Sequence, residues 1–537
     1  MSSSTSSAIT LTGVSFTWPD GTAALSGLTA TFGRGRTGLI GLNGSGKSTL
    51  LRLIRGELAP TTGSITLSGE ADYLPQSITL DTESTVADLL GIRVKLDALH
   101  AIESGDASLE KFEAIGDDWD IEALSAEALR AAGLGASDLE RAASTLSGGE
   151  TILVAIAGLR LRAAPIVLLD EPSNNLDRDA RRRLAELITG WRGALVVVSH
   201  DVALLELMDD TAELYAGRLS MFGGPYSEFV ARLEAEQHAA KQTQRAAEQA
   251  VKIEKRQRIE AETKLAHRGQ VARKAFIEKR VPKIVANGRK SAAQVSAGKL
   301  RTEFEGKLRD ARDSLDAAER RVRSDDRIHV DLPDPNVGSG RRLAQLTGTN
   351  REFLIQGPER VALIGANGVG KTTLLEELVH PESARPGRAS GVAFTARIGY
   401  LTQRLDGLDD DASVLDNVRS AAVAVPPGEV RNRLARFLIR GDSVDRAAGG
   451  LSGGERFRVS LAQVLLADPP PQLLILDEPT NNLDLGSVDQ LVEALTGYRG
   501  GLIVVSHDDV FLARLELTRW LELTADGVLR ETFPEKP

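Results

Sequence analysis

The sequence predicts an α/β protein in which two copies of one domain flank a long antiparallel α-helical hairpin. A glycine-rich phosphate loop, a strand ending in two acids and a strand ending in histidine occur twice, in the same order, along 537 residues. Strands that alternate with helices in this way form parallel sheets. The residues between the two copies are rich in Ala, Glu, Gln, Lys and Arg, which favour helix. The expected segments are a disordered lead-in at 1–7, a first domain at 8–223, the hairpin at 224–327 and a second domain at 328–537.

Composition excludes several classes of protein. The chain has no cysteine, so disulfides and thiolate metal sites are excluded, and a cytoplasmic location is expected. No apolar run reaches the roughly 18 residues that a membrane-spanning helix needs. The stretch Met1–Ala8 has neither a basic flank nor an apolar core, so it is expected to be a short lead-in rather than a signal peptide.

The first phosphate loop runs from Gly41 to Ser48 with the spacing GxxxxGK[ST]. An apolar run precedes it and a helical run follows it, which is the context that the motif requires. Glycines allow backbone N–H groups to surround phosphates, Lys47 is expected to reach the β- and γ-phosphates, and Ser48 is expected to bind Mg²⁺. The residues expected to hold ATP in this loop are Gly41, Asn43, Gly44, Gly46, Lys47, Ser48 and Thr49.

Acidic and histidine side chains follow two apolar runs downstream. The run Ile166–Asp170 is followed by Glu171, and a parallel strand that ends here sets its carboxylates at the ligand-binding edge of the sheet. Asp170 is expected to hold Mg²⁺ through water, and Glu171 to polarise the attacking water. A second run ends at His200. Alone, His200 would be interpreted as structural, but its place after the other motifs favours a catalytic role.

The same order recurs in the second copy. The interval from the second acid to the histidine is 29 residues in both copies, from 171 to 200 and from 478 to 507. The corresponding residues are Gly365, Asn367, Gly368, Gly370, Lys371, Thr372 and Thr373 in the phosphate loop, then Gln403, Asp477, Glu478 and His507, with Asp477 and Thr372 as expected Mg²⁺ ligands.

Together with Gln76 and the pentapeptide Leu-Ser-Gly-Gly-Glu, which ends at Glu150 and at Glu455, these motifs resemble the nucleotide-binding domain of the ABC ATPases. The resemblance implies two P-loop NTPase domains of the ABC type that sandwich two ATP molecules. Lys47 would work with Ser452 and Gly454, and Lys371 with Ser147 and Gly149. It also places Gln76 and Gln403 among the catalytic and Mg²⁺ residues. The pentapeptide residues expected to contact ATP are Ser147, Gly148, Gly149, Ser452, Gly453 and Gly454.

The two copies differ in three places. About 22 extra residues in the first copy predict a small helical protrusion within Ile92–Ile121, either a plain surface insertion or a binding arm. Trp18 is the favoured residue for stacking on adenine, although a core aromatic is an even alternative. The second copy has no aromatic at that distance, and Arg341 or Arg342 is the candidate replacement. Leu153 also stands where the second copy has Arg458. Both sets of hydrolytic residues are otherwise complete, so two competent sites are expected, whose rates of hydrolysis need not be equal.

The hairpin carries the positive charge of the chain. The chain has a net charge of −10, yet Ala231–Val330 holds 25 Lys and Arg against 15 Asp and Glu. The predicted arms are Ser227–Arg268, capped by Gly269, and Lys283–Asp326, which begins after Pro282. The far end is the most basic part, with 14 Lys and Arg against 4 Asp and Glu in Val251–Leu300. It is either a solvated face or a probe whose cations contact phosphates and whose Phe276 and Ile277 contact bases or a pocket.

With this spacer included, the whole chain resembles the ABC-F proteins, which have two ABC modules on one polypeptide and a charged helical linker. The resemblance implies that a monomer pairs its own two modules, binds the ribosome and inserts the linker toward the peptidyl-transferase centre, where it meets ribosomal RNA and tRNA. Family members are translation factors or displace antibiotics, and the protective role is favoured. The family's Asn-His-Leu-Asp is Asn-Asn-Leu-Asp here in both modules, so the subgroup stays open. The alternatives are the fused ATPase of a membrane importer and a DNA-maintenance ATPase.

Overall fold

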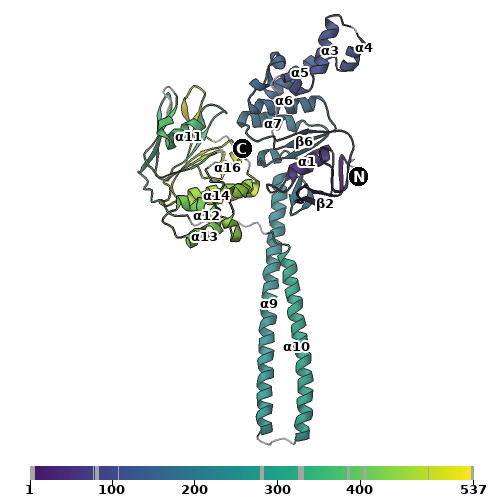
Figure 1. Cartoon of the computed structure of the whole chain (residues 1–537), viewed down its shortest axis with the longest axis vertical. Coiled ribbons are helices and arrows are strands. Elements are labelled where there is room, and N and C mark those ends of the chain that lie inside the picture. Colours follow the sequence, from purple (N-terminus) through teal and green to yellow (C-terminus); the bar gives the residue numbers. More distant parts are fainter. Residues whose placement is uncertain are drawn as a thin grey trace. The chain divides into compact units, whose positions relative to one another are not determined.

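The computed structural model describes residues 7–76, 78, 84–106, 108–277, 283–323, 332–383, 388–402, 407–481 and 483–533. Side chains between 268 and 301 are described only in part. Two compact units form, one from Met1–Tyr226 with Asp326–Pro537 and one from Ser227–Asp325. The first unit contains both nucleotide-binding modules, and the second contains the helical spacer (Figure 1). Gln403 and the lead-in 1–6 lie outside the described residues.

Each module is built on a six-stranded sheet. In module one the strand order is β5-β6-β7-β3-β8-β9, with all pairs parallel except the last. The bounds are β3 Gly35–Ile40, β5 Ala71–Leu74, β6 Ile166–Asp170, β7 Ala194–Val198, β8 Asp210–Tyr215 and β9 Arg218–Gly223. In module two the order is β14-β15-β16-β12-β17-β18. The bounds are β12 Arg360–Ile364, β14 Ile398–Leu401, β15 Leu473–Asp477, β16 Gly501–Val505, β17 Arg519–Leu523 and β18 Leu529–Thr532.

The central strands are apolar along their whole length because both faces of the sheet are covered. In β6 every residue is buried. Val167 and Leu169 belong to the apolar cluster with helix α6 (Gly148–Leu161), whereas Ile166 and Leu168 belong to the cluster with helix α1 (Lys47–Arg55). Alternate residues of a strand point to opposite faces, so a continuous apolar run is needed here. This arrangement fixes the carboxyl ends of β6 and β15, from which the acidic side chains project.

A second, antiparallel sheet of three strands lies in each module. Its order is β2-β1-β4 in module one and β11-β10-β13 in module two. The bounds are β1 Ile9–Thr17, β2 Ala23–Phe32, β4 Thr62–Leu67, β10 Arg342–Thr347, β11 Glu352–Gln356 and β13 Ser390–Ala393. The α/β class with two P-loop domains is therefore confirmed.

Module one has two short helices where the extra residues were predicted. Helices α3 (Arg93–Glu103) and α4 (Leu109–Ile115) follow α2 (Val86–Leu90) and precede α5 (Ile121–Ala132) (Figure 1). Module two passes directly from α12 (Val414–Ala421) to α13 (Pro427–Arg436) over the matching stretch. The remaining helices that bear on the sites are α7 Arg178–Thr189, α8 Val202–Leu205, α11 Lys371–Val379, α14 Gly453–Leu465, α15 Leu485–Gly497 and α16 Asp509–Ala513.

The spacer consists of helix α9 (Tyr226–Ile277) and helix α10 (Lys283–Glu319), which lie side by side (Figure 1). The predicted end of the first arm at Gly269 is wrong, because α9 runs through Gly269 to Ile277 and has 52 residues in all. The second arm begins at Lys283 as predicted but has 37 residues and ends before Asp326. One glycine costs a helix only about 1 kcal/mol, which a long helix with a paired neighbour tolerates.

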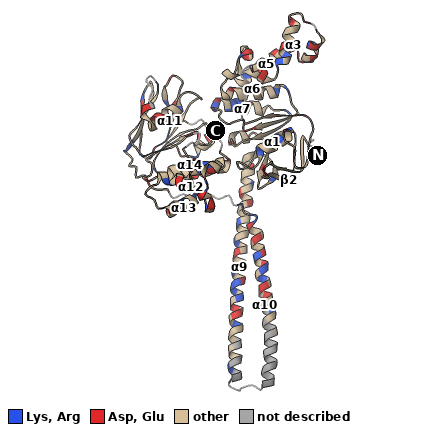
Figure 2. Cartoon of the chain, viewed as in Figure 1, with Lys and Arg blue, Asp and Glu red and all other residues tan. Residues whose placement is uncertain are grey.

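Two contacts set the register of the hairpin. Gln237 Nε2 donates to Arg321 O at 3.4 Å, and Arg323 N donates to Gln237 Oε1 at 2.8 Å. Further along, Glu254 and Lys307 interact electrostatically. In each pair the two residue numbers sum to about 560. This constant sum is expected for two antiparallel arms whose midpoint lies near residue 280. Acidic and basic side chains are interspersed along the described parts of both arms (Figure 2).

No helix among the described residues combines the length and the apolar character that a bilayer span requires.

Candidate active sites

The two phosphate loops have matching geometry. Helix α1 begins at Lys47 and α11 at Lys371, each after a glycine with positive φ. Lys47 Nζ donates to Gly41 O at 2.8 Å and to Leu42 O at 3.1 Å. Lys371 Nζ donates to Gly365 O at 2.7 Å and to Ala366 O at 2.9 Å. Both ammonium groups therefore lie inside the loop at a helix N-terminus, where an anion is favoured.

Gly41 and Gly365 cannot be replaced without moving the backbone. Their φ angles are 155° and 149°, and an added Cβ would lie 2.5 Å from Leu214 O and 2.3 Å from Leu523 O, respectively. The loop can pass this close to the neighbouring strand only because no side chain is present. The remaining predicted loop residues, Asn43, Gly44, Gly46, Ser48, Thr49, Asn367, Gly368, Gly370, Thr372 and Thr373, lie in the same two loops or in the first turn of the helix that follows.

Asp170 and Asp477 end the buried strands β6 and β15 and are themselves buried. Tyr73 donates its hydroxyl to Asp170 Oδ2 at 3.1 Å, while Asp170 Oδ1 and both oxygens of Asp477 have no hydrogen bond of normal geometry among the described residues. Burial raises the pKa of both carboxyls, and the hydroxyls of Ser48 and Thr372 lie close enough to oppose that shift. Buried carboxylate oxygens beside a hydroxyl are the donor set that Mg²⁺ prefers. The residues present therefore fit the implied ion.

Glu171 and Glu478 follow these aspartates in left-handed backbone, with φ of 51° and 46°. Their N–H groups donate to Val198 O and Val505 O, each at 2.9 Å, which pins them at the carboxyl edge of the sheet. Burial raises the pKa of each glutamate to about 7. A group with this pKa exchanges protons readily at neutral pH, as a general base must.

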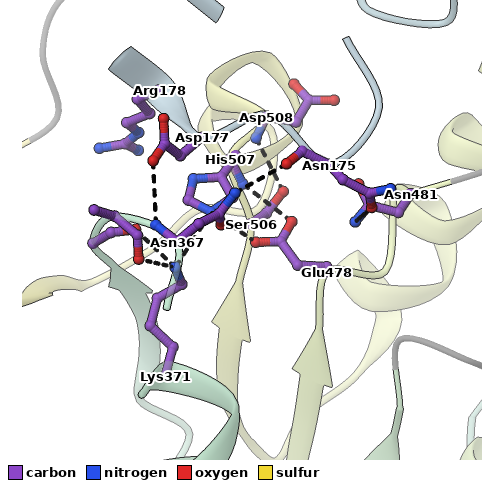
Figure 3. A network of polar contacts seen from close by, with 12 residues as sticks. Asn175, Asp177, Arg178, Asn367, Lys371, Glu478, Asn481, Ser506, His507 and Asp508 are labelled. Atoms are coloured by element: carbon purple, nitrogen blue, oxygen red, sulfur yellow. Dashed lines mark hydrogen bonds and ion pairs between the residues drawn. The ribbon is translucent and has the colours of Figure 1, made fainter. Parts of the chain in front are cut away.

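Each glutamate faces the predicted histidine. His200 Nε2 lies 3.2 Å from Glu171 Oε1, and His507 Nε2 lies 3.3 Å from Glu478 Oε1. Burial lowers the pKa of both histidines to about 3, so the imidazoles are neutral. His507 Nε2 also lies 3.0 Å from Asn367 Oδ1 and 3.3 Å from Lys371 Nζ (Figure 3). The sequence motifs thus bring lysine, glutamate and histidine together in each module.

The Leu-Ser-Gly-Gly-Glu segments form helix N-termini. Ser147 and Ser452 are the N-caps of α6 and α14, and each forms a capping box with the glutamate three residues later. Ser147 N donates to Glu150 Oε2 at 2.8 Å, and Glu150 N donates to Ser147 Oγ at 3.3 Å. The first N–H groups of each helix come from Gly148 and Gly149 in α6 and from Gly453 and Gly454 in α14. Such an end favours a phosphate group.

A cavity of about 380 Å³ surrounds the second phosphate loop. Module one contributes Asn175 and Leu176 to its lining, whereas Ser147, Gly148 and Gly149 are not among the lining residues. The structure therefore brings the segment after Glu171, rather than the Leu-Ser-Gly-Gly-Glu segment, to this site. The lining residues from module two are Asn367, Gly368, Gly370, Lys371, Thr372, Thr373, Asp477, Glu478, Asn481, Val505 and His507.

Two carboxylates that were given no role from the sequence link the modules. Asn43 N donates to Asp484 Oδ2 at 2.9 Å, and Asn367 N donates to Asp177 Oδ2 at 3.2 Å. Burial raises the pKa of each aspartate, but the N–H donors outweigh it and leave the pKa lowered, so both are ionised. The recurrence of Asn-Asn-Leu-Asp in both modules is the feature of the sequence that could have pointed to these two aspartates.

Asn175 completes this link from module one. Its backbone oxygen accepts from Asn367 Nδ2 at 2.9 Å, and its side-chain oxygen accepts from Asn481 Nδ2 at 3.4 Å (Figure 3). Each phosphate loop is thus contacted by the opposite module through one aspartate.

Trp18 directly follows β1 and packs edge-to-face on buried Phe16, with the ring centroids 4.9 Å apart. It is half-buried, so one part of the ring stays accessible. Arg341 and Arg342 lie at the start of β10, the strand of module two that matches β1, and so at the opposite end from the position of Trp18. Their predicted role as its replacement is therefore wrong. Gln76 is exposed just after β5.

Comparison with known proteins agrees with this geometry. The family model described as ABC transporter matches residues 25–174 and 349–481. The tylosin resistance ATP-binding protein TlrC of Streptomyces fradiae is 31% identical over 95% of this chain and 96% of its own length. The probable ATP-binding protein YheS of Escherichia coli K12 is 30% identical over 90% of this chain and 74% of its own length.

Solved structures share the fold at low identity. A structure of the RNase-L inhibitor covers 97% of this chain and 89% of its own, with a TM-score of 0.56 and 18% identity. A model of ribosome-bound archaeal Pelota and ABCE1 covers 97% of this chain and 78% of its own, with a TM-score of 0.55 and 18% identity. The matched family model, the relatives that align along nearly the whole chain, and the two phosphate-loop sites joined by a helical spacer agree, and the chain therefore belongs to the ABC-F type of ABC ATP-binding proteins.

Proposed function

We propose that this protein hydrolyses ATP, binds the ribosome, inserts its helical hairpin toward the tRNA and peptidyl-transferase region, and thereby protects the ribosome from antibiotics. The observation that carries the proposal is the spacer itself. Its helices of 52 and 37 residues separate two duplicated catalytic sets, and its far half holds 14 Lys and Arg against 4 Asp and Glu. A basic probe on an otherwise acidic chain suits an RNA target.

The catalytic part of the proposal assigns roles to residues of this chain. Lys47 and Lys371, with the N-terminal N–H groups of α1 and α11, bind phosphate oxygens. Ser48 with Asp170, and Thr372 with Asp477, would hold Mg²⁺, which would supply charge stabilisation at the phosphates. Gln76 would complete the first ion site, and Gln403, which lies outside the described residues, is assigned to the second from its place in the sequence. Glu171 and Glu478 accept a proton from the attacking water, since a pKa of about 7 leaves much of each carboxyl ionised at neutral pH.

His200 and His507 stay neutral and hold this geometry. Each ring lies within 3.3 Å of its glutamate, so it orients the carboxylate without competing for the proton. Closing the modules would bring Ser452 and Gly454 to Lys47, and Ser147 and Gly149 to Lys371. Because the two modules already touch through Asp177 and Asp484 within one chain, we propose that the protein acts as a monomer. We also propose that it acts in the cytoplasm.

The drug-protection part of the proposal is supported by one relative. TlrC, which aligns over nearly the full length of both chains, is named for tylosin resistance. A ribosome as partner also fits the ribosome-bound ABCE1 model, which shares the fold of this chain. A role as a translation factor is distinguished by drug susceptibility, since only protection raises the inhibitory concentration of a ribosome-targeting drug such as tylosin in a susceptible bacterium.

Co-sedimentation with bacterial ribosomes tests the proposal. The Glu171→Gln/Glu478→Gln variant should bind ATP without hydrolysing it and should pellet with ribosomes in ATP far more than the wild type. Replacing residues 266–299 of that variant by a short Gly/Ser turn should abolish pelleting while ATP binding is retained. Equal pelleting of wild type and double variant in ATP would count against a ribosome clamp, and unchanged pelleting without the tip would remove the hairpin from the contact.

A further inference from the structure

The two ATP sites face different side chains from the opposite module. Aligning the modules on Asp177 and Asp484 sets Arg178 opposite Leu485 and Arg181 opposite Val488. Aligning them on His200 and His507 sets Val202 opposite Asp509. Three charged residues near one site are therefore aliphatic near the other. Aliphatic side chains cannot form ion pairs, so this difference does not depend on small details of geometry.

Arg178 crosses from module one to module two. It directly follows Asp177, whose carboxylate accepts from Asn367 N in the second phosphate loop. Its guanidinium forms an ion pair with Asp509, two residues after His507. The guanidinium carbon also lies 5.8 Å from the ring centroid of Trp520, at a distance where a cation is attracted to the ring. Arg178 thus ties the catalytic histidine segment of module two to module one.

Arg181 lies one helical turn further along α7 and is held in place by its own module. Its Nε donates to Leu176 O and its Nη1 to Asp201 Oδ2, both at 3.2 Å. Leu176 itself lines the cavity around Lys371. The side chains of Arg181 and Asp201 are only 19% and 11% exposed, so this pair is shielded from salt.

The positive charges act on the second site. Burial lowers the pKa of His507, and the charges of Lys371, Arg181 and Arg178 lower it further. The two guanidinium groups are therefore near enough to repel cations in this site, and the same field attracts the polyphosphate of a nucleotide.

We propose that Arg178 and Arg181 of module one are positioning residues of the second ATP site, and that they make it hold nucleoside triphosphate more tightly than the first. The inference rests on the proposed ATP binding but not on the ribosome. Around the first site the matching positions are Leu485 and Val488, whereas each site faces one anionic aspartate of the opposite module, Asp484 at the first and Asp177 at the second. The second site stays engaged while the first releases its product.

Site-resolved nucleotide binding tests this asymmetry in the full chain. Lys371→Ala leaves only the first site and Lys47→Ala only the second, and the Kd of a fluorescent ATP analogue with Mg²⁺ is measured for each. In the Lys47→Ala chain, Arg178→Leu with Arg181→Val should raise the Kd about two- to tenfold, the range expected for two partly exposed cations. Because Arg178 and its partner Asp509 are more exposed than the Arg181 pair, loss of Arg178 should also make the salt dependence of this Kd between about 50 and about 300 mM KCl shallower. In the Lys371→Ala chain, the same two arginine substitutions should leave the Kd of the first site unchanged.

Matched variants separate charge from structure. Arg182→Leu removes a charge from the same helix, but Arg182 pairs with Asp179 at the surface, where the side chains are 68% and 71% exposed, so it should leave both sites unchanged. Arg178→Lys keeps the positive charge, so it should retain most of the affinity of the second site and most of the salt dependence of that affinity. The reverse exchange, Leu485→Arg with Val202→Asp, should tighten the first site by a similar factor, and it remains informative if the arginine variants fold poorly.

Two results would overturn the asymmetry. Equal affinity of both sites in the parent chain would do so, as would an equal loss at both sites when Arg178 and Arg181 are replaced. If neither site binds the analogue, the proposed ATPase function itself fails. If both sites bind but the chain never pellets with ribosomes, the ribosome proposal fails while the asymmetry stands.

Discussion

Glu171 and Glu478 are held in a backbone conformation that glutamate rarely adopts. Left-handed φ at a residue other than glycine costs of order 1 kcal/mol or more and persists where the surroundings over-determine it. Here the surroundings are the hydrogen bonds to Val198 and Val505 at the carboxyl edge of the sheet. This strained backbone conformation directs each carboxyl toward a histidine. An apolar side chain at the end of an ordinary strand would not need such a conformation.

Activity should follow the ionisation of these glutamates. Burial raises their pKa to about 7, so the carboxyls are protonated and unable to accept a proton below that pH. We expect kcat/KM for ATP hydrolysis to fall about tenfold per pH unit below about pH 6, and to level off above about pH 8. Rates measured from pH 5.5 to 9, with Glu171→Gln and Glu478→Gln singly, would show whether each remaining site keeps this limb. A flat profile would exclude glutamate as the base.

The same shift affects stability in the opposite direction. A carboxyl whose folded pKa is raised stabilises the fold below its unfolded pKa of 4.5, and that contribution is lost as pH rises through about 7. The glutamates therefore favour activity at the pH at which they contribute least to folding.

Most residues of the site could be predicted from the sequence because each belongs to a motif with fixed spacing. The lysines, aspartates, glutamates and histidines of both modules lie together at the sheet edges as the strand–loop–helix pattern requires. The roles of Asp177 and Asp484 could not be predicted, because their partners are 190 and 441 residues away. Arg341 and Arg342 were misplaced because residue counting ignored the shorter β10–β11 hairpin.

At the scale of elements, the continuation of α9 past Gly269 shows that the interactions along a long helix offset the cost of one glycine. Gly298 lies inside α10 in the same way, without ending it. Intrahelical pairs such as Arg256 with Glu260 and Arg258 with Glu262 add a few tenths of a kcal/mol each. Summed along an arm, these terms are comparable with the cost of about 1 kcal/mol for one glycine, which the capping argument treated in isolation.

Gln237 is the residue that fastens the end of α10. It donates to Arg321 O and accepts from Arg323 N, so Gln237→Ala removes two hydrogen bonds just beyond the last turn of α10. The loss should be about 1–2 kcal/mol of local stability. Amide hydrogen exchange near residues 317–323 should accelerate about five- to thirtyfold, with exchange in β6 unchanged. Thr243→Ala, on an exposed face of the same helix, serves as the control. Equal effects of the two variants would contradict this role.

At the scale of the whole molecule, the two modules touch without the Leu-Ser-Gly-Gly-Glu segment lining the cavity around Lys371. Ser147 is exposed in this arrangement. If ATP draws the modules together, this serine should become covered. The chain has no cysteine of its own, so a single introduced thiol reports its position cleanly.

We expect Ser147→Cys in the Glu171→Gln/Glu478→Gln chain to react with a maleimide quickly without nucleotide. With ATP and Mg²⁺ the rate should drop about tenfold, provided that the closed state exceeds about 90% of the population. Ser137→Cys, also exposed, should react at the same rate in both conditions. A fluorescent ATP analogue verifies that the variant still binds nucleotide. An unchanged rate at Ser147→Cys would argue against closure of the two modules on ATP.

The unbroken course of α9 has a mechanical consequence. The helix begins at Tyr226, which is half-buried and whose pKa burial raises to about 12, so its first turn packs against the rest of the chain. Its 52 residues make a rod about 78 Å long. A rotation of about 5° in that first turn displaces the far end by about 7 Å, roughly the length of two nucleotides stacked on one another. A helix of this length would therefore convert a small change of angle at its first turn into a displacement of several ångströms at its other end.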